Sequence, residues 1–516
     1  MSVAASRYDF EAELPHQKRT LNAIWRSRVD ESASREFLWF PRRGYVSYGD
    51  LDRRAASFRV RLASGGIGHG SRVCLLMRNS PEMLASMLAV WSLGGVVVPL
   101  NFQLKGVLLK DLTERVDPSL LVIDAELAEH VSAELRSDLG DRLWTSPDDL
   151  AADAGHSLRL EMAEVEPWSL ALILYTSGST GPSKGCMLTH QFCSYYAWVF
   201  WRYMGYAESD VLFTCLPLYH THALFASAWP AILAGARLAI APHFTASGFT
   251  RQLHDSGATA FGAMGTMASI LLAQPRSELE VELNLRLAHI APCPPRLQEF
   301  ESRFGVKVVS SLYGLTEAMI FPPQPSDPPE PGKLGRNPPD WEVAIVDPNL
   351  QPEPDGIAGE LVARPRIPGI IFEGYHGRPE DTVKAFRGLW YHTGDICRRD
   401  SSGTYWFVGR AGDVIRRRGE NVSTYELEKV LGEHIDVKEI AALGLHSSLG
   451  EDDIAVVAVL RPGAQLSEDA FRAWAEDILP RYMRPDVVRL LDTQLPKLAN
   501  GKIDKATLAD QLTRGD

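Results

Sequence analysis

The chain has 516 residues, of which 45% are apolar, so it is long enough for two to four domains and can bury a sizeable core. Disorder as the main state is therefore excluded. Asp and Glu number 65 against 53 Lys and Arg, and the resulting formal charge of -12 disfavours a general nucleic-acid binder. The six cysteines are scattered without a CxxC pair, which argues against a disulfide framework or structural zinc and favours a reducing, cytoplasmic location.

The N-terminal residues and the longest apolar run argue against export and against membrane insertion. Acidic residues follow the start at once, at Asp9, Glu11 and Glu13, so no signal peptide is expected. The apolar run 83–100 approaches the length of a membrane span, but serines, glycines and a proline interrupt it. Ser80-Pro81 predicts a capped helix start, and 96–98 predicts a short buried strand. We therefore expect no transmembrane segment.

Short β-rich runs alternate with helical patterns through most of the chain. The predicted strands are 72–77, 96–98, 120–123, 169–175 and 343–346. This alternation predicts an α/β fold with layered, substantially parallel sheets in a large N-terminal domain. The proline-rich segment 322–331 predicts an ordered surface loop.

A second, smaller domain is predicted after a glycine-punctuated boundary at 409–412. Ser423-Thr-Tyr-Glu426 has the form of a capping box at a helix start. Strands at 439–443 and 454–460 and a helix at 471–479 follow. We expect an N-terminal domain over 1–410 and a small, mobile α+β domain over 411–516.

The segment 175–185, Tyr-Thr-Ser-Gly-Ser-Thr-Gly-Pro-Ser-Lys-Gly, follows an apolar strand and has the composition of a phosphate-binding loop. Its glycines let backbone N–H groups converge on an anion, its hydroxyls add donors, and Lys184 adds a positive charge. A Walker A loop is excluded because Ser183 precedes the lysine and Gly185, which has no hydroxyl, follows it.

This loop resembles the signature loop of the adenylate-forming superfamily of acyl-CoA synthetases, adenylation domains and beetle luciferases, from which it departs at Pro182-Ser183. Further blocks similar to the family's follow in its order, at 311–318, 391–395, 409–410 and 495–502, so the resemblance covers nearly the whole chain. It implies that ATP and AMP are bound by Thr176, Ser177, Gly178, Ser179, Thr180, Gly181, Lys184, Ala291, Pro292, Ser311, Leu312, Tyr313, Gly314, Leu315, Asp395 and Arg410.

The resemblance also implies individual roles. Tyr313 would stack on adenine, and Asp395 would accept both ribose hydroxyls, as an ionised carboxylate can. Two catalytic residues are expected to touch the reacting groups, Thr316 at the α-phosphate and Lys502 at the substrate carboxylate and the bridging oxygen. Glu317 would hold Mg2+, a hard cation that prefers oxygen ligands.

The acyl site is implied by a block at 216–223 that is similar to the family's Leu-Pro-x-Phe-His-x-x-Gly. His220 matches the family's histidine near the acyl carboxylate and is expected to be catalytic, whereas His222 matches no assigned position. The expected acyl pocket comprises Tyr219, His220, Phe225 and Ile290. No acidic residue occurs in 219–230, which disfavours an α-amino acid because its buried ammonium group would be unpaired.

Aromatic residues near this block favour an apolar or aromatic acid, although much of the set could equally be ordinary helix core. Segments 367–375 and 418–426 look like the carnitine/crotonobetaine-CoA ligase branch, but they lie outside the acyl pocket. They therefore place the chain within the family better than they identify its acid.

Two further sites depart from the family's pattern, and a hairpin that follows the second of them is expected to come near the thiol of coenzyme A. His289-Ile290 replace the common Gly-Gly before Ala-Pro, and Gly412 stands at the hinge where Asp or Lys is usual. Glycine tolerates large backbone rotation, so Gly412 should still allow domain rotation. The hairpin residues Arg418, Gly419 and Glu420 would bind coenzyme A. Its arginines, 416–418, either pair with CoA phosphates or form a solvated face.

The implied reaction has two halves. A small carboxylic acid attacks ATP to give an acyl-adenylate and pyrophosphate, and the thiol of coenzyme A then displaces AMP. ATP, Mg2+ and coenzyme A are the expected cofactors, and the enzyme is expected to be a monomer or homodimer. Two alternatives stay open: a ligase that loads a carrier-protein phosphopantetheine, and a non-catalytic nucleotide-binding homologue.

Overall fold

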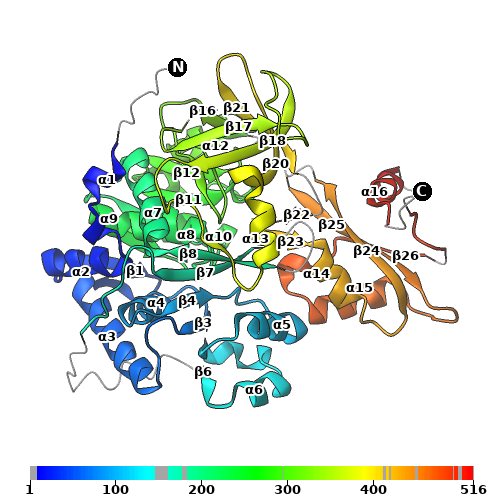
Figure 1. The fold of residues 1–516 in the computed structure, drawn as a ribbon, viewed down its shortest axis with the longest axis horizontal. Coiled ribbons are helices and arrows are strands. Elements are labelled where there is room, and N and C mark those ends of the chain that lie inside the picture. The colour runs from blue at the N-terminus through cyan, green and yellow to red at the C-terminus, as the bar shows by residue number, and fades with distance from the viewer. Residues whose placement is uncertain are drawn as a thin grey trace.

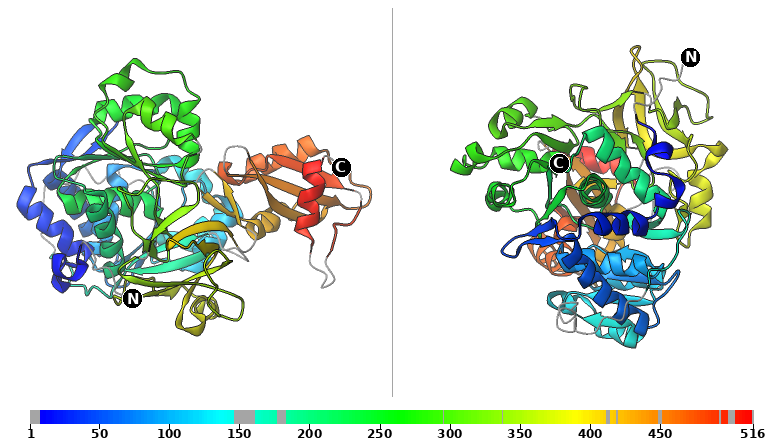
Figure 2. Two further views of the ribbon diagram at one scale, coloured as in Figure 1. Left: turned by 90° about the horizontal axis from the view of Figure 1, so that it is seen from above. Right: turned by 90° about the vertical axis from the view of Figure 1, so that its left-hand side faces the viewer.

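The computed structural model describes residues 8–145, 161–176, 183–294, 296–336, 338–410, 414–417, 420–447, 451–491, 493–497 and 503–514. Most of the chain forms one large body of sheets and helices, and the C-terminal elements form a smaller body at one side of it (Figures 1 and 2). This arrangement is the predicted α/β fold with a small α+β unit at the C-terminus.

The first large sheet carries the strand that precedes the phosphate-binding loop. Its strand order is β19-β8-β7-β4-β3-β5-β6, in which β3 to β7 are parallel and β8 is antiparallel to both of its neighbours, β7 and β19. The strands are β3 (Arg72–Leu76), β4 (Val96–Pro99), β5 (Leu120–Ile123), β6 (Leu143–Thr145), β7 (Leu170–Thr176), β8 (Lys184–Thr189) and β19 (Gly374–Tyr375). The four strands predicted in this part of the chain are confirmed.

The apolar run 83–100 forms a helix and a strand. Helix α4 (Pro81–Ser92) begins at Ser80, whose side chain accepts a hydrogen bond from the Met83 backbone N–H, and β4 follows. Nearly every residue of α4 is buried, as expected for a helix that is apolar on all sides. Among the described residues, no helix has the length and apolar character needed to span a membrane.

The second large sheet lies beside the first and has the order β13-β12-β11-β9-β10-β1-β2, all parallel except the β1–β2 pair. Its strands are β1 (Glu36–Phe40), β2 (Gly44–Ser47), β9 (Val211–Thr214), β10 (Arg237–Ile240), β11 (Ala260–Met264), β12 (Leu287–Ala291) and β13 (Lys307–Val309). Because ligands of parallel sheets bind at the carboxyl ends of strands, Ala291 stands at a site-forming edge.

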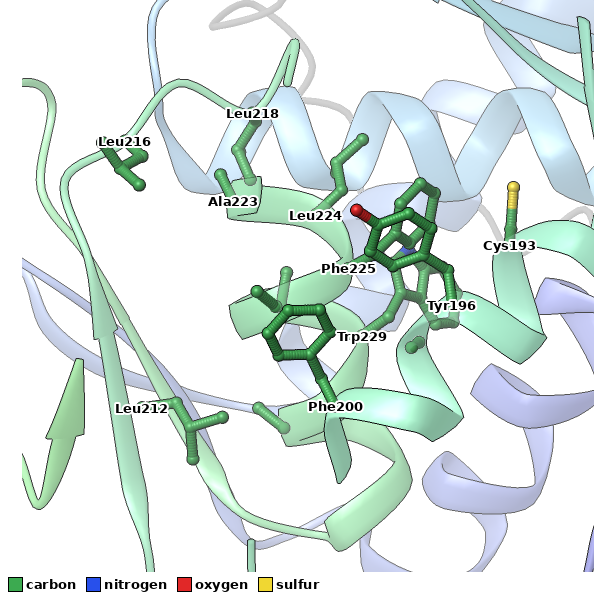
Figure 3. Packing of buried hydrophobic residues seen from close by; sticks show 14 of the residues in the cluster. Cys193, Tyr196, Phe200, Leu212, Leu216, Leu218, Ala223, Leu224, Phe225 and Trp229 are labelled. Carbon is green, nitrogen blue, oxygen red and sulfur yellow. The ribbon is translucent and has the colours of Figure 1, made fainter. Parts of the chain in front are cut away.

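Helices bury the faces of these sheets. Helix α7 (His190–Met204) packs against α9 (Trp229–Ala234) and α2 (Leu21–Ser32). Figure 3 shows the rings of Tyr196, Phe200, Phe225 and Trp229 gathered in this core. The remaining helices of this body are α1 (Phe10–Glu13), α3 (Tyr48–Ser64), α5 (Gly106–Val116), α6 (Ala133–Leu139), α8 (Thr221–Ala223), α10 (Ala246–Ser256), α11 (Gly265–Leu272), α12 (Leu297–Phe304) and α13 (Pro379–Ala385).

A third sheet, antiparallel throughout, places Asp395. Its order is β16-β21-β20-β18-β17, and β14 (Tyr313–Gly314) pairs with β15 (Met319–Phe321) nearby. The strands are β16 (Lys333–Arg336), β17 (Trp341–Val346), β18 (Ala358–Pro365), β20 (Tyr391–Arg399) and β21 (Thr404–Arg410). The predicted strand at 343–346 lies in β17, and the proline-rich segment is the loop between β15 and β16.

The small C-terminal unit has the predicted α+β composition. It comprises β22 (Val414–Arg417), β23 (Glu420–Ser423), α14 (Thr424–Leu431), β24 (Val437–His446), β25 (Asp452–Leu460), α15 (Glu468–Ile478), β26 (Val487–Leu491) and α16 (Lys505–Arg514). The Ser423 side chain caps α14 by accepting from the Glu426 backbone N–H, which confirms the N-cap of the predicted capping box. The Glu426 carboxylate reaches across to the large body, as described below.

The two bodies share a packed interface. Leu108 of α5, in the large body, is buried in the hydrophobic core of the small one with Leu427 and Leu431 of α14. Polar contacts flank it: Lys429 pairs with Asp111, and the Arg481 backbone N–H donates to Gln103. Figure 1 shows α5 beside α14.

Candidate nucleotide and acyl binding site

A cavity of about 1750 Å³ lies between the large body and the small C-terminal unit. It collects residues that are far apart in the sequence. The described residues of the predicted site that line it are Thr176, Lys184, Tyr219, His220, Ala291, Pro292, Leu312, Tyr313, Gly314, Leu315, Thr316, Glu317, Asp395 and Glu420.

Several predicted site residues lie outside the described residues: Ser177, Gly178, Ser179, Thr180, Gly181, Gly412, Arg418, Gly419 and Lys502. For Arg410 the backbone is described, and it pairs with Asp395 between β21 and β20. Ser311 is buried beside the cavity without lining it.

Both ends of the predicted phosphate-binding loop are held in place. Thr176 pairs with Lys184 across the β7–β8 ladder, so the loop is a hairpin connection. The Lys184 ammonium lies 3.9 Å from the Asp381 carboxylate and 5.0 Å from the centre of the Tyr375 ring. The Ser183 backbone N–H and hydroxyl donate to Glu426 at 2.7 and 2.5 Å. A helix of the small unit is thereby tied to the end of this loop.

The predicted adenine and ribose residues lie in direct contact. The Tyr313 hydroxyl donates to Asp395 Oδ2 at 2.5 Å, and both side chains are buried. Burial and the neighbouring carboxylate raise the pKa of Tyr313 well above its usual value, so its hydroxyl stays a donor. The Asp395 backbone N–H donates to the Thr393 hydroxyl at 3.1 Å, within strand β20.

Glu317 is held by a tyrosine that sequence reasoning did not single out. The Tyr375 hydroxyl, on β19, donates to Glu317 Oε1 at 2.9 Å, and both residues line the cavity. Burial, followed by the charge of Glu317, raises the pKa of Tyr375. The described residues contain no cluster of three or more His, Cys, Asp or Glu side chains that could hold a metal alone. The Glu317 carboxylate, beside the expected phosphate position, fits Mg2+, which is usually held by one or two carboxylates plus substrate phosphates and water.

The predicted catalytic histidine meets the small C-terminal unit. His220 Nε2 lies 2.9 Å from Glu420 Oε2, and the Tyr219 hydroxyl donates to Glu420 Oε1 at 3.1 Å. Burial lowers the pKa of His220, but the Glu420 carboxylate outweighs burial and raises it above its usual value. Of the residues expected to bind coenzyme A, the described one, Glu420, therefore lies next to the histidine that is expected to stand near the acyl carboxylate.

Two residues predicted to form the acyl pocket lie elsewhere. Ile290 is fully buried and does not line the cavity, whereas its neighbours His289 and Ala291 do. Side chains alternate between the faces of a strand, so the residue facing the cavity is His289 and not Ile290. Phe225 is buried in the core behind the pocket, with its ring centre 5.5 Å from that of Tyr196 (Figure 3).

The structure brings in three residues that had no assigned role. His222 and His289 line the cavity together, and Tyr375 supports Glu317. A departure from the family's pattern marked His289 in the sequence. Nothing local marked His222 or Tyr375, because their contacts join segments that are far apart in the sequence.

Family models match most of the chain. The model of AMP-binding enzymes matches residues 25–376, and the model of the C-terminal domain of AMP-binding enzymes matches residues 426–502. A crotonobetaine/carnitine–CoA ligase of Salmonella typhimurium is 30% identical over 487 residues, covering 90% of this chain and 92% of that protein.

Solved structures share the fold across both bodies. An o-succinylbenzoate CoA synthetase from Bacillus subtilis, bound to a product analogue, superposes with a TM-score of 0.81 over 95% of this chain and 97% of that one, at 23% identity. ATP-bound MatB from Rhodopseudomonas palustris gives a TM-score of 0.69 over 96% and 98%, at 27% identity. The chain belongs to the family of AMP-binding enzymes, the adenylate-forming superfamily to which its sequence blocks point.

Proposed function

We propose that the protein is an ATP-dependent acyl-CoA ligase that activates a hydrophobic carboxylic acid as an acyl-adenylate and transfers the acyl group to coenzyme A. The observation that carries this proposal is the convergence, in one cavity, of Lys184, the Tyr313–Asp395 pair, Glu317 and the His220–Glu420 contact. Membership of the family and the similarity to CoA ligases support the same activity.

Adenylation requires positioning and charge neutralisation more than covalent chemistry from the protein. Asp395 would hold the ribose, Tyr313 would cover adenine, and Lys184 would meet the phosphates near Thr316. Glu317 would hold Mg2+, which neutralises phosphate charge when bound. Lys502 would add the positive charge at the reacting carboxylate.

The contacts of the small C-terminal unit favour coenzyme A transfer as the second half-reaction. Glu420, which is next to Gly419 in the sequence, touches His220, and this contact supports transfer of the acyl group to a thiol at this side of the cavity. Arg417, in the same hairpin, lines the cavity and pairs with Asp486. We assign the boundary between the two domains to residues 410 and 411 and the hinge to Gly412.

The test is ATP–pyrophosphate exchange across a panel of carboxylic acids that includes carnitine and crotonobetaine, followed by addition of coenzyme A and mass detection of the thioester. Exchange with an acid, followed by an acyl-CoA product, is the expected result. If exchange occurs without an acyl-CoA product, and the acyl group is instead transferred to a phosphopantetheinylated carrier protein, then the acceptor is the carrier protein and not coenzyme A. No exchange with any acid would overturn the ligase assignment in favour of a nucleotide-binding homologue.

A further inference from the structure

Two histidines from different elements lie together on one wall of the cavity. His289 stands on β12 two residues before Ala291, so it shares that residue's face and lies about 7 Å farther from the strand's carboxyl end. His222 stands on α8, two residues after His220. The ring centres of His222 and His289 are 4.4 Å apart, with their planes inclined by 40°. We call these two residues the histidine pair.

His289 is buried, and its ring can form further hydrogen bonds. Its side chain lines the cavity although the residue is only 3% exposed. Among the described residues, neither of its ring nitrogens has a hydrogen-bond partner, whereas buried polar atoms in folded proteins normally have one. Burial, together with the nearby His222, holds the pKa of His289 well below its usual value. The ring is therefore neutral and offers one donor and one acceptor.

The backbone around the histidine pair leaves room for it. Gly262 of β11 pairs with His289 in the sheet, and a Cβ atom at this glycine would come within 2.9 Å of His222 Nε2. The segment after α8, η5 (Leu224–Ala228), is a π-helical turn that carries Ala226 into the cavity wall. Such turns are rare and occur frequently at functional sites.

Aromatic side chains pack beside the histidine pair. The Phe200 ring meets His289 edge to face at 5.0 Å, and Tyr196 stacks on Phe200 at 6.0 Å. Met264 and Met267 line the same cavity. A neutral imidazole in such surroundings favours a neutral hydrogen-bonding group over an anion. It also disfavours a plain hydrocarbon, which would leave the ring nitrogens unpaired.

We infer that the acid activated by this enzyme carries a neutral hydrogen-bonding group, a hydroxyl or a carbonyl, on the part remote from its carboxylate, and that His222 and His289 bind this group. The inference rests on the proposed function, because it takes the cavity beyond His220 as the acyl site. It makes the histidine pair the specificity determinant of that site.

The test uses pairs of acids matched in size, which differ only in whether the remote group can form a hydrogen bond. The pairs are 4-hydroxyphenylacetate with 4-methylphenylacetate, 4-acetylbenzoate with 4-isopropylbenzoate, and 8-hydroxyoctanoate with nonanoate. Pyrophosphate exchange gives kcat/KM for each acid. We expect the wild-type enzyme to prefer the polar member of at least one pair by tenfold or more. His289→Leu and His222→Leu should each lower that ratio by about tenfold.

Two further variants separate recognition from folding. His289→Asn keeps a donor and an acceptor and should retain part of the preference. His254→Leu, on the surface helix α10 outside the cavity, should leave the ratio unchanged. Thermal unfolding identifies any variant that has not folded. If one variant does not fold, the ratio of the wild-type enzyme and the ratios of the remaining variants test the inference.

The outcomes distinguish this inference from the proposed function. Preference of the wild-type enzyme for the apolar member in every pair would overturn the inference, while the observed exchange would still support acid activation. A polar preference that survives both leucine variants would likewise exclude the histidine pair as its source. No exchange with any acid of this set or of the wider panel would overturn the ligase assignment itself, and the inference with it.

Discussion

Glu420 of the small C-terminal unit lies 2.9 Å from Nε2 of His220 in the large body. Together with the hydrogen bond from Tyr219 to the same carboxylate, this contact joins the small C-terminal unit to the large body beside the expected acyl site.

The His220–Glu420 contact should make docking of the small domain depend on pH. Because Glu420 raises the pKa of His220, the ion pair is fully present below the usual histidine pKa of about 6.5 and is lost as the pH rises through the raised value. His220 is 34% exposed, so solvent screens the pair and the docked fraction should change at most about fivefold. Fluorescence transfer between dyes on the two domains, measured from pH 5.5 to 9, follows the change. His220→Gln should remove it, and a pH dependence that persists in this variant would contradict the assignment.

Lys502→Ala should lower adenylation by roughly 10²–10³-fold, the scale for loss of one charge contact to the transition state. Pyrophosphate exchange with a saturating acid measures the effect. Lys438→Ala is the matched control, because Lys438 is an exposed lysine on β24 of the small C-terminal unit. A wild-type exchange rate in Lys502→Ala would refute its catalytic role.

Gly419→Leu should block thioester formation while sparing adenylation, because a bulky side chain next to Glu420 would obstruct the expected thiol path. Preformed acyl-adenylate mixed with coenzyme A in a single turnover isolates this step. Equal losses in both half-reactions would show that the residue acts on folding or on the shared site.

Glu317→Gln should reduce adenylation by about 10²-fold or more and weaken its dependence on Mg2+, because the neutral amide lacks the charge that attracts the cation. Tyr375→Phe removes the hydrogen bond that orients Glu317 and should raise the Mg2+ concentration needed for half-maximal rate by up to about tenfold. Magnesium titrations of the exchange rate measure both. Tyr45→Phe, whose hydroxyl bonds the Ser256 carbonyl, is the control. An unchanged Mg2+ requirement in Tyr375→Phe would argue against this support.

Asp210→Asn should destabilise the large domain by about 2–3 kcal/mol, because its carboxylate, 3% exposed, bonds Arg286, Thr259 and the Ala207 backbone N–H. Burial alone would raise the pKa of Asp210, but these partners outweigh it and lower the pKa. The stabilisation is therefore present above the unfolded pKa of about 4 and is lost as the pH falls through the lowered folded value. Urea unfolding at pH 7 and pH 3 measures it. Asp255→Asn, on the surface, should change stability by less than about 0.5 kcal/mol.

Local sequence patterns predicted the elements because each carries its own signal. Ser80-Pro81 marks a helix start, and Val96–Val98 marks a buried strand, whatever the rest of the chain does. The phosphate-binding loop and the Tyr313 block were identifiable because their residue types and order are distinctive. The match to the model of AMP-binding enzymes therefore agrees with the family that these motifs indicate.

Local patterns could not predict which face of a strand a side chain is on, or which distant segments of the chain are in contact. β12 is buried on both faces, so its sequence has no polar alternation that would separate His289 from Ile290. The contact between Ser183 and Glu426 joins residues 243 positions apart and depends on how the two bodies dock. The sequence predicted that Glu426 takes part in the capping box of its own helix, and only the folded structure shows its contact with Ser183.

Leu108 lies in the hydrophobic core of the small C-terminal unit although its helix, α5, belongs to the large body. A fragment that ends at residue 410 would expose this leucine, and Leu104 beside it, to water. Burial of one leucine is worth about 2 kcal/mol, and an exposed apolar patch promotes association between molecules. The isolated N-terminal fragment should therefore be less stable and more prone to aggregate than the intact chain, however well its own sheets fold.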